Sequence, residues 1–206
     1  MAVSDISICS EALLRLGDKT ISSFEGGDDR VILCANIYPT RKDAILSSYD
    51  WRFTVTKEQL ARETTAPVNE WTYAYKLPSA RIIDGPIAVF NSTQVGVGTI
   101  TGFEIFGDQL FTNENVIVVD YQTIVDESKW PKYFVEFMVK VMMVELAFPI
   151  TDINSVRIEL YKEVFGLPNE SGMGGMFGAA RARNARETPP VPISDFALIN
   201  ARFGGV

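Results

Sequence analysis

The spacing of apolar residues changes twice along this chain, and that change constrains the fold more than any other feature. Near the N-terminus, apolar residues recur every three or four positions, as at Ile6, Cys9 and Leu13, which is typical of an amphipathic helix. Across residues 71–76, aromatic residues alternate with small or polar ones, which is the period of a β-strand. After Asp126 the helical spacing returns. This order predicts an α+β fold, an antiparallel helical bundle with an inserted small antiparallel β-sheet.

Polar stretches mark the boundaries between these parts. The stretch before residue 70 is polar and contains Pro67, which is typical of a linker. We therefore expect the helical bundle at residues 1–62 and 124–168, and the inserted β domain at residues 70–122. Within the bundle, Pro149 is expected to end a long helix, because a proline removes a backbone donor and clashes with the preceding turn.

The C-terminal segment, residues 171–206, differs from everything before it. Its glycines flank methionines, its arginines follow, and then come three prolines within four residues, with no sustained apolar period. The segment carries a net charge of +2 in a chain whose formal net charge is −7. This composition predicts an extended C-terminal tail.

Charge and residue usage exclude several classes of function. With 19 basic and 26 acidic residues, broad neutralisation of DNA phosphates is not expected, although an acidic channel wall would let a duplex pass without holding it. The chain has no histidine, which removes the common zinc sites and histidine-based catalysis. We expect no cofactor and no metal. Cys9 and Cys34 are interpreted as reduced core residues, with a disulfide as the alternative.

The apolar runs are too short to cross a bilayer, and residues 1–10 do not have the pattern of a signal peptide. We therefore expect a protein made in the cytoplasm, without a membrane partner.

The pieces of this sequence, in their order, resemble the tail tubular protein A family, the adaptor proteins that form a ring between portal and nozzle in short-tailed bacteriophages. The resemblance spans most of the chain, and its specificity comes from the joint order of short motifs. These motifs are ALLRLG at 12–17, YPTRKDAIL at 38–46, DWRF at 50–53, WTYAYKLP at 71–78, GDQLFTN at 107–113 and AARARNAR at 179–186.

The resemblance implies a structural role without catalytic residues. It implies a homo-oligomeric ring, a dodecamer, that docks beneath the portal protein and receives the tail nozzle protein. DNA would leave the capsid through this ring without sequence-specific binding. The protein would be made in the host cytoplasm and end in the neck of the virion.

The family's terminal segments grip neighbouring subunits and the portal, so the resemblance implies a portal contact in the C-terminal tail. The basic side chains there can be a clamp on acidic portal residues, a solvated charge run or a contact with phosphate. The apolar side chains beyond them fit a partner groove, or fold back on the chain's own bundle. The expected portal-contact residues are Arg181, Arg183, Arg186, Phe196, Leu198, Ile199 and Phe203.

A glycine-rich stretch, residues 96–102, lacks the Lys-Ser/Thr ending of a phosphate loop and does not lead into a helix. We interpret it as a β-turn or a flexible hairpin tip that faces the nozzle or the channel, with Gly96, Val97, Gly98 and Thr99 as its candidate residues. The aromatic residues of strand 71–76 could stack on bases, but few basic residues accompany them, so a place in the sheet core is favoured.

The sequence is also compatible with two other functions. A connector or stopper protein of a long-tailed phage would share the ring role and differ in its distal partner. An acidic metal-dependent hydrolase would use Asp28, Asp29 or Glu145 as ligands, although paired acidic residues in loops are more often helix caps.

Overall fold

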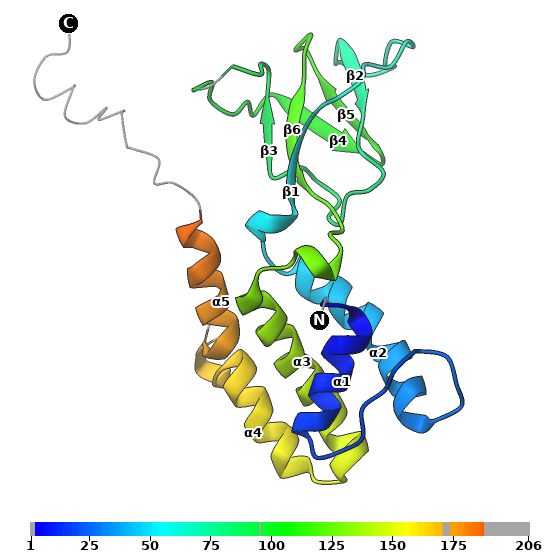
Figure 1. Ribbon diagram of the computed structural model, residues 1–206. Coiled ribbons are helices and arrows are strands. Elements are labelled where there is room, and N and C mark those ends of the chain that lie inside the picture. The colour runs from blue at the N-terminus through cyan, green and yellow to red at the C-terminus, as the bar shows by residue number, and fades with distance from the viewer. Residues whose placement is uncertain (1–2, 95, 171–173, 188–206) are drawn as a thin grey trace, which may run out of the picture.

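A computed structural model describes residues 3–94, 96–170 and 174–187 of the chain. Within these residues, the protein has a helical bundle and a β part that lie end to end (Figure 1). The α+β fold predicted from the sequence is therefore confirmed. The predicted portal-contact residues Phe196, Leu198, Ile199 and Phe203 lie outside the described residues.

The bundle is organised around its third helix. That helix contacts each of the other four, and ten of its residues are buried, which explains why it is apolar on nearly every side. The five helices are α1 (Asp5–Arg15), α2 (Asp29–Ser47), α3 (Lys132–Thr151), α4 (Asn154–Phe165) and α5 (Gly175–Arg186).

Local signals fix the ends of the first two helices. Gly17 has φ +86 just after the α1 C-cap, and its N–H donates to the carbonyl of Leu14 while the next N–H donates to that of Leu13, which is a Schellman ending. Asp28 is the N-cap of α2, and its carboxylate accepts from the Arg30 N–H at 3.1 Å. Of the paired acidic residues that the sequence offered as helix caps, Asp28 and Asp29, it is Asp28 that caps α2.

The prediction that Pro149 ends the long helix is wrong. Helix α3 continues through Pro149 to Thr151, and Asp152 then ends it in the left-handed region at φ 55. Leu146 and Ala147, in this last part of α3, are fully buried. These buried residues precede Pro149, which is exposed and is the third residue from the helix end, so the proline does not break a long ladder of hydrogen bonds.

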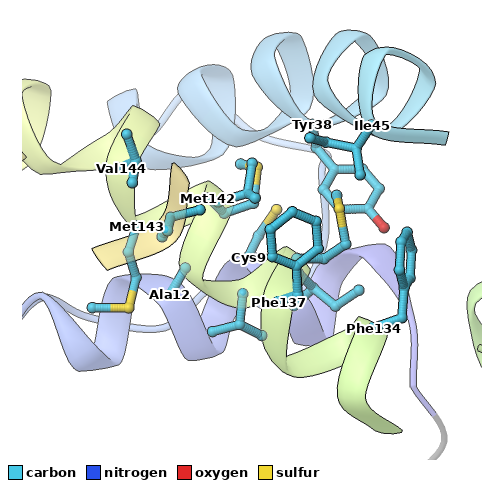
Figure 2. Packing of buried hydrophobic residues seen from close by; sticks show 14 of the residues in the cluster. Cys9, Ala12, Tyr38, Ile45, Phe134, Phe137, Met142, Met143 and Val144 are labelled. Carbon is cyan, nitrogen blue, oxygen red and sulfur yellow. The ribbon is translucent and has the colours of Figure 1, made fainter. Parts of the chain in front are cut away.

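Core packing joins α1, α2 and α3. Figure 2 shows Cys9 from α1 and Tyr38 from α2 lying against Phe134, Phe137 and Met142 of α3, all of them buried. The indole ring of Trp51, just after α2, lies 4.8 Å from the Phe134 ring in an edge-on arrangement. The bundle thus has one continuous apolar core.

The β part consists of two antiparallel three-stranded sheets, whereas one sheet was expected. One sheet has the order β1-β6-β3 and the other the order β2-β5-β4. Its own apolar cluster includes Tyr75, Leu110 and Val119, which confirms the sheet-core interpretation for Tyr75. The strands are β1 (Val55–Gln59), β2 (Tyr73–Lys76), β3 (Ala88–Phe90), β4 (Phe103–Phe106), β5 (Gln109–Thr112) and β6 (Val118–Gln122).

The β part begins earlier than the expected boundary at residue 70. Strand β1 lies within the range 1–62 that was assigned to the bundle, and it pairs with β6 from Val55 opposite Gln122 to Gln59 opposite Val118. Four of its five side chains are exposed, so the strand lacks the alternation that reveals strands in a sequence. Residues 55–59 form a strand because they pair with β6, which follows roughly sixty residues later in the chain.

The prediction of an extended C-terminal tail over 171–206 is wrong for residues 175–186, which form α5. This helix packs on α3 and α4, and the ring of Phe177 lies 5.6 Å from that of Phe137. Gly175 at the first position has φ +60, and a Cβ there would lie 2.5 Å from the carbonyl oxygen of Glu163. The glycine that made the segment look irregular is what lets α5 approach α4.

Candidate functional site

The junction between the bundle and the β part is held by a buried amide. Gln122, the last residue of β6, is fully buried, and its Nε2 donates to the carbonyl of Tyr49 at 3.0 Å and to Thr54 Oγ1 at 2.9 Å. A longer contact of 3.4 Å reaches the carbonyl of Leu46 in α2. Since a buried amide without partners is costly, these bonds fix the orientation of β6 relative to the end of α2.

Trp51 supports the same junction from the bundle side. Its indole Nε1 donates to the carbonyl of Ile45 at 2.9 Å, which holds the turn after α2 against the helix that it leaves. The next residues form η1 (Arg52–Thr54), and the N–H of Thr123 donates to the carbonyl of Thr54 at 2.9 Å. The chain therefore enters and leaves the β part through hydrogen-bonded segments that lie side by side.

Helix α5 is attached to this junction by Asn184. The side chain is buried, its Oδ1 accepts from the Arg52 N–H at 2.7 Å, and its Nδ2 donates to the carbonyl of Asp50 at 3.1 Å. An amide that satisfies one backbone donor and one backbone acceptor fixes the position of the helix along its axis. The C-terminal end of α5 is thereby held beside the β part, as Figure 1 shows.

The structure separates the three arginines of α5. The guanidinium of Arg181 is half-buried and lies 4.6 Å from the centre of the Tyr49 ring and 5.6 Å from that of Phe177. Arg183 and Arg186 are exposed. Arg181 thus contributes to packing within the molecule, whereas Arg183 and Arg186 present charge to the outside.

A surface hollow lies where α5 meets the β part. Two carboxylates line it, and Asp120 is also paired with Lys57 at 2.9 Å. Arg52 and apolar side chains from both parts form the rest of the wall, so the hollow combines apolar surface with charges of both signs. Its lining residues are Tyr49, Asp50, Arg52, Val55, Ile87, Asp120, Asn184 and Ala185.

The predicted nozzle-facing or channel-facing residues lie in the loop between β3 and β4. Gly96 has φ +88, a conformation that L side chains rarely adopt, and it is exposed together with Gly98 and Thr99, while Val97 is half-buried. The loop leads to β4 rather than to a helix, but it is not the hairpin tip expected from the sequence, because β3 and β4 lie in different sheets. The contact of this loop with the nozzle or the channel stays a prediction.

The remaining candidate groups have structural partners. Cys9 and Cys34 are buried and free, as predicted, and a hydrogen bond with Cys34, together with burial, raises the pKa of the Cys9 thiol. Asp28 caps α2 and pairs with Arg30 at 2.9 Å, and Glu145 pairs with Arg41 at 3.0 Å.

Within the described ranges, no group of three or more Cys, Asp or Glu side chains is placed to hold a metal ion. Nor does any helix of the part that the structure describes have the length and apolar character needed to cross a bilayer.

Sequence reasoning missed the two residues that hold the junction, Gln122 and Asn184. Gln122 ends an apolar strand and Asn184 lies among arginines, so both resemble ordinary surface positions. The available signal for Asn184 is spacing, because Phe177, Ala180 and Asn184 recur at three and four residues and share one face of α5.

No protein-family model matches this chain, and a search of curated proteins gives no match either.

Proposed function

We propose that this protein is a structural ring subunit of a bacteriophage head-to-tail connector. In this role it links the portal to the tail nozzle, lines part of the DNA ejection channel, and resides in the neck of the virion. The order of motifs along the sequence led to this proposal, and the fixed junction between the bundle and the β part is the structural observation that supports it.

An adaptor between two rings has to hold two binding ends in a constant relative orientation. The buried bonds of Gln122 and Asn184 provide such a constraint, since they tie β6, the end of α2 and α5 together. A freely hinged pair of domains would lack it, because inter-domain motion is the default where an interface is small and polar. The molecule therefore has the mechanical property that the proposed role needs.

Two exposed surfaces differ in chemistry, one near the junction at the C-terminal end of α5 and one in a loop of the β part. Exposed Arg183 and Arg186 lie on α5, and we assign them to an acidic surface of the portal. The exposed loop with Gly96 and Gly98 lies in the β part, and we assign it to the nozzle or the channel. The net charge of −7 suits a wall along which DNA passes without adhering.

Light scattering can test this function with the portal protein encoded in the same genome. The mass of the purified portal ring is measured alone and after addition of the chain, and we expect the gain of a full dodecamer. The variant R183E/R186E should add much less mass, because two exposed charges are reversed. The variant Lys76→Glu, a charge reversal at an exposed position of β2, serves as the matched control and should add as much as the wild type.

Two outcomes separate the parts of this proposal. If the wild-type chain adds no mass to the portal ring, the connector role is refuted. If wild type and R183E/R186E add the same mass, the connector role stands and the assignment of these arginines to the portal is wrong.

A further inference from the structure

Helix α4 carries large apolar side chains on its outer surface. Ile158 is 46% exposed and Tyr161 is 51% exposed, and both line a surface hollow together with Arg157 and Lys162. We call these four residues the α4 face. The Tyr161 ring lies 5.0 Å from that of Phe165, so the apolar surface continues toward the core. Single exposed apolar residues are ordinary, but here two of them line one hollow together with two cations.

The first turn of α2 and the residues just before it carry a surface with an exposed isoleucine and the opposite charge. Ile32 is 46% exposed, and the exposed carboxylates of Glu25, Asp28 and Asp29 precede it. We call these four residues the α2 acidic end. Arg30 is the cation among them, and it is shared between Asp28 at 2.9 Å and Asp18 at 2.7 Å. The α2 acidic end therefore keeps a negative charge around an exposed isoleucine.

The two surfaces lie on opposite flanks of the bundle. Figure 1 shows α2 on one side and α4 on the other, with α1 and α3 between them. In agreement, α4 packs on α3 and α5, while α2 packs on α3 and α1. The two surfaces cannot meet within one molecule, but they can meet between two copies that follow one another around a ring.

We propose that the α4 face of one copy packs against the α2 acidic end of the next copy. Ile32 would lie on the apolar floor of Ile158 and Tyr161, and Arg157 and Lys162 would pair with the carboxylates of the neighbour. Such a contact joins two different surfaces, so it repeats head to tail. It closes into a ring when the rotation between neighbouring copies brings the last copy back to the first. It rests on the proposed ring function and identifies which faces of the subunit form the ring.

The contact is weak in isolation. A helix of 12 residues is roughly 18 Å long, and with a width of about 10 Å its face covers roughly 180 Å². A stable interface needs about 800 Å² from each partner, so the remainder has to come from the rest of each flank. We therefore expect free subunits to associate only at high concentration, and a portal ring to align them.

Disulfide trapping detects such a contact even when it is short-lived. Full-length Ile158→Cys and full-length Ile32→Cys are mixed under oxidising conditions, at high concentration and again on the portal ring. The native Cys9 and Cys34 are buried and do not compete. The matched control replaces Ile32→Cys with Ile124→Cys, since Ile124 is an isoleucine that is 61% exposed outside both surfaces. Each single variant alone serves as the blank.

The proposal predicts a cross-linked dimer with one copy of each variant, at a yield at least several-fold above that of the Ile124→Cys mixture. Adding R157E/K162E to the Ile158→Cys chain should lower this yield several-fold. Adding E25K/D29K to the Ile32→Cys chain should then restore much of it, because the charges are complementary again. Asp28 is left unchanged in this test, since it caps α2.

The outcomes distinguish this contact from the ring function itself. Equal cross-linking of Ile32→Cys and Ile124→Cys, both free and on the portal ring, overturns the contact. If the portal ring still gains a full dodecamer of mass in that case, the connector function stands and other faces form the ring. If selective cross-linking occurs but the portal gains no mass, the contact stands and the connector function fails.

Discussion

Replacement of Gln122 by leucine tests whether the junction amide holds the two parts together. Leucine fills a similar volume, so the change removes the hydrogen bonds and leaves most of the packing. The bonds to the Tyr49 carbonyl and to Thr54 Oγ1 are short, whereas the 3.4 Å contact to Leu46 is long and contributes little. Leucine also removes the buried Oε1, which has no hydrogen-bond partner, so at about 1 kcal/mol for each short bond we expect the free energy of unfolding to fall by at most about 2 kcal/mol.

The loss should not exceed that value, because the former partners of Gln122 keep other hydrogen bonds. The Tyr49 carbonyl still accepts from the Trp51 N–H at 2.8 Å, and the Thr54 hydroxyl still donates to the Trp51 carbonyl at 2.7 Å. For a chain of this length, about 2 kcal/mol corresponds to a decrease in Tm of roughly 4–8 °C.

Urea unfolding and calorimetry measure this effect, with Gln59→Leu as the matched control at an exposed position of β1. The control should lie within about 0.5 kcal/mol of the wild type, as surface substitutions usually do. Amide hydrogen exchange at Thr54 and Thr123 should also accelerate in the Gln122→Leu protein, because the junction opens more often. An unfolding free energy within about 0.5 kcal/mol of wild type, with unchanged exchange, would refute this account of the junction.

Two further changes test α5 and an ion pair of the bundle. Asn184→Ala should lower the free energy of unfolding by about 1–2 kcal/mol in urea, because two backbone groups lose their partner; an unchanged urea midpoint would contradict the role of Asn184 as the attachment of α5. Hydrogen bonds from Arg15 at 2.5 and 3.0 Å hold the pKa of Glu136 below its usual value. A lowered pKa in the folded state stabilises the fold above the usual carboxyl pKa, and this contribution is lost as pH falls through the lowered pKa. Glu136→Gln should therefore cost about 0.5 kcal/mol at neutral pH, since the pair is partly exposed and screened, and should approach the wild type in acid. A difference that is constant from neutral pH into acid would show that the ion pair is not its cause.

The structure places the three candidate arginines of α5 in two different environments. The exposed positions of Arg183 and Arg186 agree with their assignment as surface charges, because a charged residue without an apolar neighbour pattern normally stays in water. Arg181 differs because Tyr49, more than a hundred residues earlier, provides the ring over which it lies. No local pattern around Arg181 contains that information.

The sequence by itself determined the features that depend on a few neighbouring residues. The apolar period predicted α1 and α3, and the paired acidic residues Asp28 and Asp29 predicted the helix cap that Asp28 provides at the start of α2. These signals depend on hydrogen bonds and side-chain contacts within one or two turns. The same is true of the strand character of residues 73–76.

Where local preference is weak or is outweighed, only the tertiary structure decided which conformation a segment adopts. Strand β1 exists because β6 pairs with it, and α5 forms because α3 and α4 bury its face despite the glycines at its start. Gln122 and Asn184 became junction residues because the fold brings backbone groups from distant segments to their amides. In each case the free energy comes from burial and from hydrogen bonds between segments far apart in the sequence, which a local pattern does not encode.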